Sequence, residues 1–124
     1  MKLRIRGNSI RLRLTKSEVD SFSTGGRVEE TVDFGDGTAK FGYALEAVDA
    51  RDLSAEFAGG TIRVLVPRDR AQGWVNSEQV GIESDEDSPL RILIEKDFAC
   101  LQVRPGEPDD DAFPNPEPGN CHAA

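Results

Sequence analysis

The residues best suited to metal or redox chemistry lie near the C-terminal end of the chain: Cys100, Cys121 and His122. Two thiolates and an imidazole suit zinc or copper, with an aspartate as the fourth ligand. Their spacing differs from that of zinc motifs, which carry close Cys or His pairs, and Cys100 has the apolar neighbours Ala99 and Leu101, as a buried thiol does. Three interpretations stay open: a metal or thiol-redox site, a Cys100–Cys121 disulfide, and two reduced thiols. We predict no cofactor unless these residues bind zinc or copper.

Catalytic motifs are scarce elsewhere in the chain. His122 is its one histidine, so no histidine acid, base or triad can be built inside a folded domain that precedes it. The glycine pairs at 25–26 and 59–60 fit a helix stop and a hairpin turn better than a phosphate-binding loop. An enzyme that relies on Asp or Glu alone stays an alternative, but the sequence favours a non-enzymatic protein.

The second candidate site is basic and begins at the N-terminus, where the first sixteen residues carry six bases and no acid. Apolar and cationic residues alternate there with the period of a half-buried strand. The Gly-Asn pair at 7–8 predicts a type II′ turn whose register places Leu3 opposite Leu12 and Arg4 opposite Arg11. The hairpin then has one aliphatic and one cationic face. We predict that the cationic face binds through Lys2, Arg4, Arg6, Arg11 and Arg13.

Like charges opposite one another destabilise a hairpin, so this face needs anions nearby. Acids on neighbouring strands are one source, since the stretch 27–34 would present Glu29 and Asp33 on one face and Glu46, Glu56 and Glu95 lie in other strand-like stretches. The acidic tail 104–124, with its Asp run at 109–111 and an aromatic residue at 113, is another. An anionic macromolecule or a protein partner is the third. The net charge of −8 argues against duplex DNA, whose binding depends on neutralising phosphates.

The elements that would position these sites follow from capping and turn signals. Thr15 and Glu18 form a capping box for a helix that ends at 25–26. Strands are predicted at 27–34, 39–47, 53–58 and 61–66, and Pro67 is predicted to start a second short helix. Phe22 and Trp74 would pack these two helices on the core.

The apolar pattern recurs along the chain. An offset of 52 aligns 10–14 with 62–66, Phe22 with Trp74 and Val28 with Val80, and an offset of 49 aligns 41–46 with 90–95. We infer two βαββ units, about 9–46 and 61–97, joined by one extra strand. The predicted fold is therefore α+β: a largely antiparallel sheet or partial barrel in a single domain, 1–103, followed by the Pro-rich tail 104–124.

The second unit, "GGTIRVLVPRDRAQGWVNSEQVGIESDEDSPLRILIEKD", resembles an AbrB-like swapped-hairpin βαββ unit. The resemblance implies dimers or tandem units, many of which bind DNA or serve as antitoxin dimerisation modules. The segments "GNSIRLRLTKSEVDSF", "LIEKDFACL" and "DAFPNP" resemble a family of short bacterial proteins with no assigned function. A homodimer is one form that the AbrB-like resemblance allows.

Composition limits the class of protein. A chain of 124 residues, 37% hydrophobic and 31% charged, is typical of a small globular protein. No apolar run is long enough for a membrane span, and no secretory signal is recognisable at the N-terminus. We predict a cytoplasmic binding or regulatory module that uses the basic hairpin face, with metal binding or thiol redox chemistry as the alternative.

Overall fold

The computed structural model describes residues 1–98 and contains two helices and two four-stranded sheets, which confirms the α+β class. The elements, in chain order, are β1 Lys2–Arg6, β2 Ser9–Leu14, α1 Lys16–Gly25, β3 Arg27–Asp33, β4 Lys40–Val48, β5 Ser54–Ala58, β6 Thr61–Pro67, α2 Arg68–Val75, β7 Gly81–Glu83 and β8 Arg91–Lys96. None of the helices in residues 1–98 is long and apolar enough to cross a membrane.

Each sheet combines one hairpin from each half of the chain. The first sheet has the order β1-β2-β8-β7, and the second has the order β3-β4-β6-β5. The outer pairs are antiparallel, whereas the central pairs β2–β8 and β4–β6 are parallel. The sequence predicted mostly antiparallel pairing in one sheet. The parallel centres arise because a hairpin of the second half adds its second strand, β6 or β8, beside the second strand of a hairpin of the first half.

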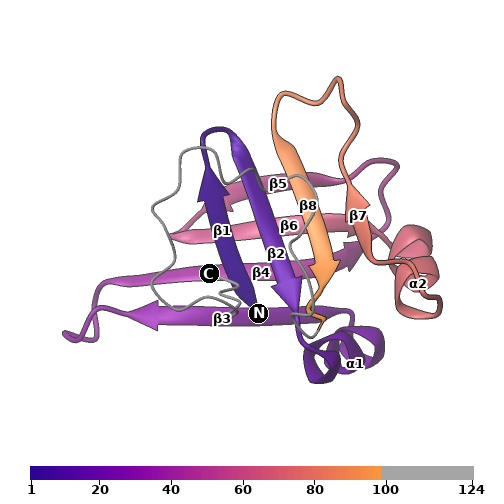
Figure 1. Ribbon diagram of the computed structural model, residues 1–124. Coiled ribbons are helices and arrows are strands. Elements are labelled where there is room, and N and C mark those ends of the chain that lie inside the picture. Colours follow the sequence, from indigo (N-terminus) through magenta and orange to yellow (C-terminus); the bar gives the residue numbers. More distant parts are fainter. Residues whose placement is uncertain (99–124) are drawn as a thin grey trace, which may run out of the picture.

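The two sheets lie face to face, and the strands of one run across those of the other (Figure 1). Aliphatic side chains from both inner faces fill the space between them, as in other crossed-sheet packings. Leu12 and Ile94 of the first sheet and Leu45 and Val64 of the second are fully buried there. This core holds the hairpin β1–β2 with its aliphatic face inward, so its cationic face points away from the second sheet.

The two helices close one end of this core. Thr15 caps α1 and forms the predicted capping box with Glu18, and Gly26 ends the helix with a φ of 74°. Pro67 is the last residue of β6 and caps α2, one position earlier than predicted. The rings of Phe22 and Trp74 meet edge to face, with their centroids 6.3 Å apart.

The pairing registers of the two halves correspond residue by residue. Adding 52 to both members of a β1–β2 pair gives a β5–β6 pair, so that Arg4↔Arg11 becomes Glu56↔Arg63. The parallel pairs correspond in the same way. If 52 is added to the residue number on β2 and 49 is subtracted from the number on β8, the pair Leu12↔Ile94 becomes Val64↔Leu45, which is a β6–β4 pair. The extra strand β5 therefore occupies the place in the second sheet that β1 occupies in the first.

One predicted alignment is wrong. Val28 pairs with Leu45, and Ile82 pairs with Ile94. Because Leu45 and Ile94 correspond under the offset of 49, the counterpart of Val28 is Ile82 and not Val80. The connection after α2 is two residues longer than the connection after α1, which sequence matching by a single offset could not detect. The internal repeat itself stays a prediction, and we return to it below.

Candidate binding surface on the first sheet

The basic hairpin has the register that its sequence predicted. Lys2 lies opposite Arg13, Arg4 opposite Arg11, and Leu3 opposite Leu12. Gly7 has a φ of 55°, whereas no residue other than glycine in the described chain has a positive φ. A positive φ at the first loop position alone fits a type II′ turn. The turn therefore sets the parity that puts all of the cations on one face.

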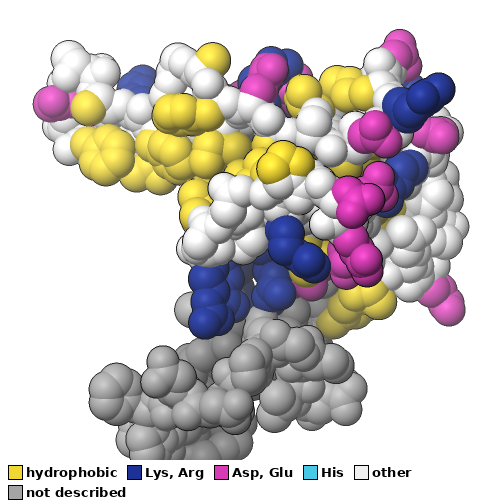
Figure 2. Space-filling model, turned by 90° about the horizontal axis from the view of Figure 1, so that it is seen from above, with side chains coloured by type: hydrophobic (Ala, Val, Ile, Leu, Met, Phe, Trp, Pro, Cys, Tyr) yellow, Lys and Arg dark blue, Asp and Glu magenta, His cyan; other side chains and the backbone are white. Residues whose placement is uncertain are grey.

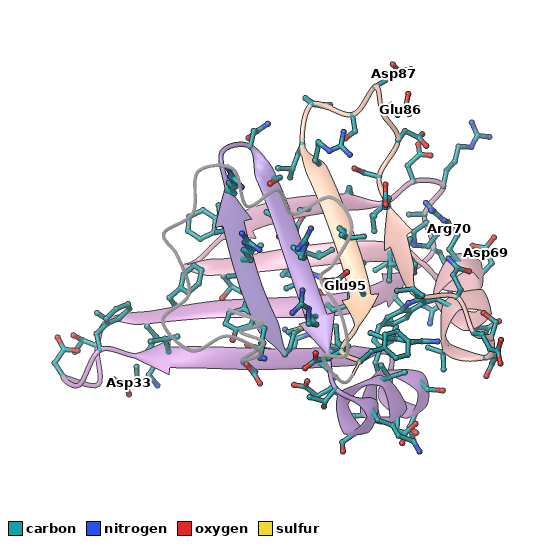
Figure 3. All side chains as sticks on the ribbon, in the orientation of Figure 1. Asp33, Asp69, Arg70, Glu86, Asp87 and Glu95 are labelled. Atoms are coloured by element: carbon teal, nitrogen blue, oxygen red, sulfur yellow. The ribbon has the colours of Figure 1, made fainter. Side chains whose placement is uncertain are left out.

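The acids nearest this face come from β8, the strand on the other side of β2. Glu95 lies opposite Arg13 in the parallel register, and its Oε1 accepts hydrogen bonds from Arg13 Nε at 3.0 Å and Nη2 at 2.9 Å. The Nε of Arg11 lies 3.9 Å from the same oxygen, and Lys2 Nζ lies 3.9 Å from Asp97 Oδ2. Figure 3 shows Glu95 on the side of the first sheet that faces away from the second.

Accessibility increases from β8 toward the edge of the sheet. Arg13 is only 5% exposed, which removes its guanidinium from the part of the face that a partner could contact. Arg11 is intermediate, and Lys2, Arg4 and Arg6 are exposed. Among the strands of residues 1–98, β1 is an edge strand that pairs with β2 alone, and the residue across the ladder from Arg4 is another arginine. Figure 2 shows Lys and Arg side chains gathered on this side of the molecule.

The same positions in the second sheet carry alternating charges. Glu56 stands where the first sheet has Arg4, Arg63 where it has Arg11, and Glu46 where it has Glu95. Arg63 forms ion pairs with both acids, and its Nε lies 2.5 Å from Glu46 Oε2. The hydrogen bond from Arg63 holds the pKa of Glu46 below its ordinary value, although burial acts in the opposite direction. Across β5, β6 and β4 of the second sheet the charged side chains are therefore an acid, a base and an acid. Across β1, β2 and β8 of the first sheet they are a base, a base and an acid.

The acidic face predicted for 27–34 does not neutralise the hairpin. Glu29 and Glu46 point outward from the second sheet, on the opposite side of the molecule from Arg4 and Arg11, and Arg27 contacts both of them. Parity alone predicted which residues share a face. It could not predict that the two sheets would turn their charged faces away from each other.

A polar cluster at the start of β1 was not predicted. The amine of Met1 contacts Glu18 and lies 2.9 Å from Glu30 Oε1, and the hydroxyl of Tyr43 donates to Glu30 Oε2 at 2.6 Å. Burial raises the pKa of Tyr43, as does the bond to Glu30, to about 12. Burial would raise the pKa of Glu18, but bonds from the Met1 amine and Thr15 lower it below its ordinary value. The cluster ties β1 to α1, β3 and β4.

The predicted metal or redox residues Cys100, Cys121 and His122 lie outside the described residues, as does the tail 104–124. Within residues 1–98, no group of three His, Cys, Asp or Glu side chains could hold a metal ion. A small acidic hollow lined by Asp52, Asp85, Asp87 and Arg70 lies beside the loop between β7 and β8. It combines three carboxylates with one guanidinium, and its residues do not form a metal-ligand set within residues 1–98.

Comparison with known proteins agrees with the resemblance to an uncharacterised family. A model described as "Family of unknown function (DUF7009)" matches residues 1–117. The chain belongs to this family. No curated protein and no solved structure matches it, so the AbrB-like resemblance of the second unit stays a prediction. The DUF7009 match extends through the segment 109–113 of the tail, whereas Cys121 and His122 lie beyond its last residue.

Proposed function

We propose that this DUF7009 protein is a small cytoplasmic, non-enzymatic module that binds an acidic segment of a partner protein through Lys2, Arg4, Arg6 and Arg11. The observation that carries the proposal is the charge difference at equivalent positions of the two sheets, where Arg4 replaces the acid that Glu56 supplies. In the second sheet, Arg63 forms ion pairs with the acids on both neighbouring strands, so alternating charges are compatible with this fold. The arginine pair Arg4 and Arg11 adds a second cation where the second sheet has an acid, and this arrangement fits a face that attracts an anionic segment.

The form of the face favours an acidic protein segment over nucleic acid. The cations occupy two adjacent strands, and the remainder of the described surface carries most of the acids that give the chain its net charge of −8. A duplex extends over many phosphates and would meet those acids. An extended acidic peptide can follow the hairpin alone, and Arg side chains bind carboxylates with two parallel hydrogen bonds.

We also infer that the two halves descend from one duplicated ββαββ unit, about 2–48 and 54–96. The shared registers and the edge positions of β1 and β5 support this. In this view a duplicated scaffold kept an ion-paired sheet for stability in one half, and its copy diverged into a cationic face. The charges of the second sheet can therefore be compared, position by position, with those of the cationic face on the first sheet.

The proposal is tested with a fluorescein-labelled peptide of alternating Asp and Glu residues and the full-length protein. Replacing Arg4 and Arg11 with glutamine should weaken binding about tenfold or more at low salt, because each lost cation removes about 1 kcal/mol of attraction. The matched control, Arg51→Gln with Arg68→Gln, has the same net charge but lies outside the hairpin. Equal weakening by both double variants, or no binding by the native protein, would contradict the proposal.

A labelled 20-base-pair duplex provides the second arm of the test. We expect much weaker retention of the duplex than of the acidic peptide at the same salt concentration. Tighter binding of the duplex that is lost with Arg4→Gln and Arg11→Gln would assign the face to nucleic acid and overturn the choice of partner.

A further inference from the structure

Large apolar side chains remain exposed on the inner face of the second sheet. Phe34 is 66% exposed, Phe57 67% and Val32 44%, and Phe41 is partly exposed. Val32 lies opposite Phe41 and Phe57 opposite Ile62, so these side chains share a face with the core residues Leu45 and Val64 of the same sheet. We call the surface formed by Val32, Phe34, Phe41 and Phe57 the apolar shelf.

The shelf exists because the two sheets differ in extent. Seen from above, the second sheet projects past the first, and hydrophobic side chains line the side that faces the first sheet (Figure 2). Where the first sheet covers this face, Leu45 and Val64 are fully buried. Beyond the edge strand β1, Phe34 and Phe57 are exposed, and no other element of residues 1–98 lies over them (Figure 1). A contiguous group of exposed aromatic residues of this kind marks a contact site.

The shelf adjoins the basic face across one strand. Along β1, Arg4 and Arg6 point to the cationic side, and Ile5 between them points to the inner side, where it is 55% exposed. A ligand that crosses this edge could therefore place a carboxylate on one side of β1 and an aromatic ring on the other. The shelf itself belongs to the second sheet, and packed sheets lie about 10 Å apart, so such a ligand must reach across the edge of β1 to contact both.

We propose that the apolar shelf is the docking site of the chain's own segment 108–116, "PDDDAFPNP", with the ring of Phe113 against the shelf and Asp111 beside Arg4 or Arg6. The segment carries an acid close to an aromatic residue, since only Ala112 lies between Asp111 and Phe113. The flanking prolines restrict its conformations and so lower the entropy lost on docking. The family match, which runs to residue 117, includes the whole segment.

Chain length and charge favour this occupant over a second copy of the protein. Phe113 lies fifteen positions after Phe98, and an extended chain of that length reaches about 50 Å. Two copies would each bring a net charge of −8, with Asp33 and Asp36 near the end of the shelf (Figure 3 shows Asp33). The tethered segment is instead present at a high effective concentration.

The first test records amide NMR spectra of the full-length protein and of Phe113→Ser. Loss of the ring should shift the amide signals of residues 32–34, 41 and 57. Asn115→Ser, which changes the same segment without removing the apolar anchor, should leave them in place. Unchanged shelf signals in Phe113→Ser would overturn the proposal. No partner is added, so the outcome does not depend on the proposed function.

The second test measures cleavage on the amino side of Asp110 and Asp111 by a protease specific for the bond that precedes aspartate. Both Phe113→Ser and the shelf variant Phe34→Ser should speed cleavage roughly tenfold, because proteolysis follows the population of the undocked segment. The double variant should be cleaved no faster than either single variant. Phe34 is 66% exposed, so its replacement should leave the fold intact, and unfolding in urea checks this. Additive effects of the two changes would contradict docking between the two residues.

Analytical ultracentrifugation tests whether a second copy of the protein occupies the shelf instead. We expect a monomer whose shelf signals do not change with protein concentration. A dimer that dissociates in Phe34→Ser but persists in Phe113→Ser would assign the shelf to a second copy and overturn the proposal.

Discussion

At the scale of single residues, positions with the same pairing register in the two sheets differ in charge. Arg63 lies between two acids, whereas Arg11 lies between another arginine and Glu95. Arg13 is the buried member of the basic set, and its guanidinium has Glu95 as an ion-pair partner. Residues of one type on one face thus have different energetic roles, which depend on their distance from β8.

The first prediction compares Arg13 with Arg4. Arg13→Gln should lower the free energy of unfolding by about 3 kcal/mol, because it leaves the carboxylate of Glu95, 13% exposed, without its closest cation. Arg4→Gln should change it by no more than about 0.5 kcal/mol, since the side chain is exposed and faces Arg11 across the ladder. Urea unfolding followed by the fluorescence of Trp74 measures both. Comparable losses in the two variants would show that Arg4 is structural.

The second prediction concerns acid. The pKa of Glu46 is lowered in the folded state by its bond to Arg63, so the ion pair stabilises the protein above the ordinary Glu pKa of 4.5, and this contribution is lost as the pH falls through the lowered value. Glu46→Gln should cost about 1 kcal/mol at pH 7 and much less at pH 3. Unfolding in urea at the two pH values gives the difference.

Glu56→Gln is the matched control for this change. Glu56 contacts the same arginine, but its side chain is 47% exposed, so its loss should cost less than half as much. An equal cost at both pH values for Glu46→Gln would contradict the ion-pair explanation.

At the scale of elements, α1 connects the two sheets and also completes the polar cluster at Met1. Glu18 is the third residue of the helix, where it accepts from the backbone of Thr15 at 2.9 Å and also contacts the Met1 amine. The capping box therefore positions a carboxylate for β1 as well as starting the helix.

The third prediction tests this link. Thr15→Ala should lower the free energy of unfolding by about 1 to 2 kcal/mol through loss of the cap. It should also speed hydrogen exchange at β1, because Glu18 loses part of its support. Thr24→Ala removes a hydroxyl near the other end of α1, which bonds Asp20 O at 3.1 Å, and should affect neither. Exchange at β1 that is unchanged in Thr15→Ala would contradict the link.

At the scale of the whole molecule, the halves of the chain are interlocked. β2 of the first half pairs with β8 of the second, and β4 pairs with β6 in the other sheet. Neither half can form either complete sheet alone. The single domain 1–103 stays a prediction, which this pairing between the two halves favours.

The fourth prediction is therefore one cooperative unfolding transition. Trp74 fluorescence reports on α2 in the second half, and far-ultraviolet circular dichroism reports on both sheets. We expect the two urea transitions to coincide, as they do for two-state domains of this size. A separate Trp74 transition would show that one half unfolds independently.

The sequence by itself determined the local features. The turn at 7–8, the parity of the cations and the capping box at Thr15 depend on residues close in the chain or on periodic patterns, and each was predicted correctly. Only the tertiary structure decided which faces meet. The parallel pairing of β2 with β8 brought Glu95 to Arg13, and the unequal extent of the sheets left Phe34 and Phe57 exposed. These features join residues far apart in sequence, where periodicity fixes a strand's two faces but not the strand that lies beside it.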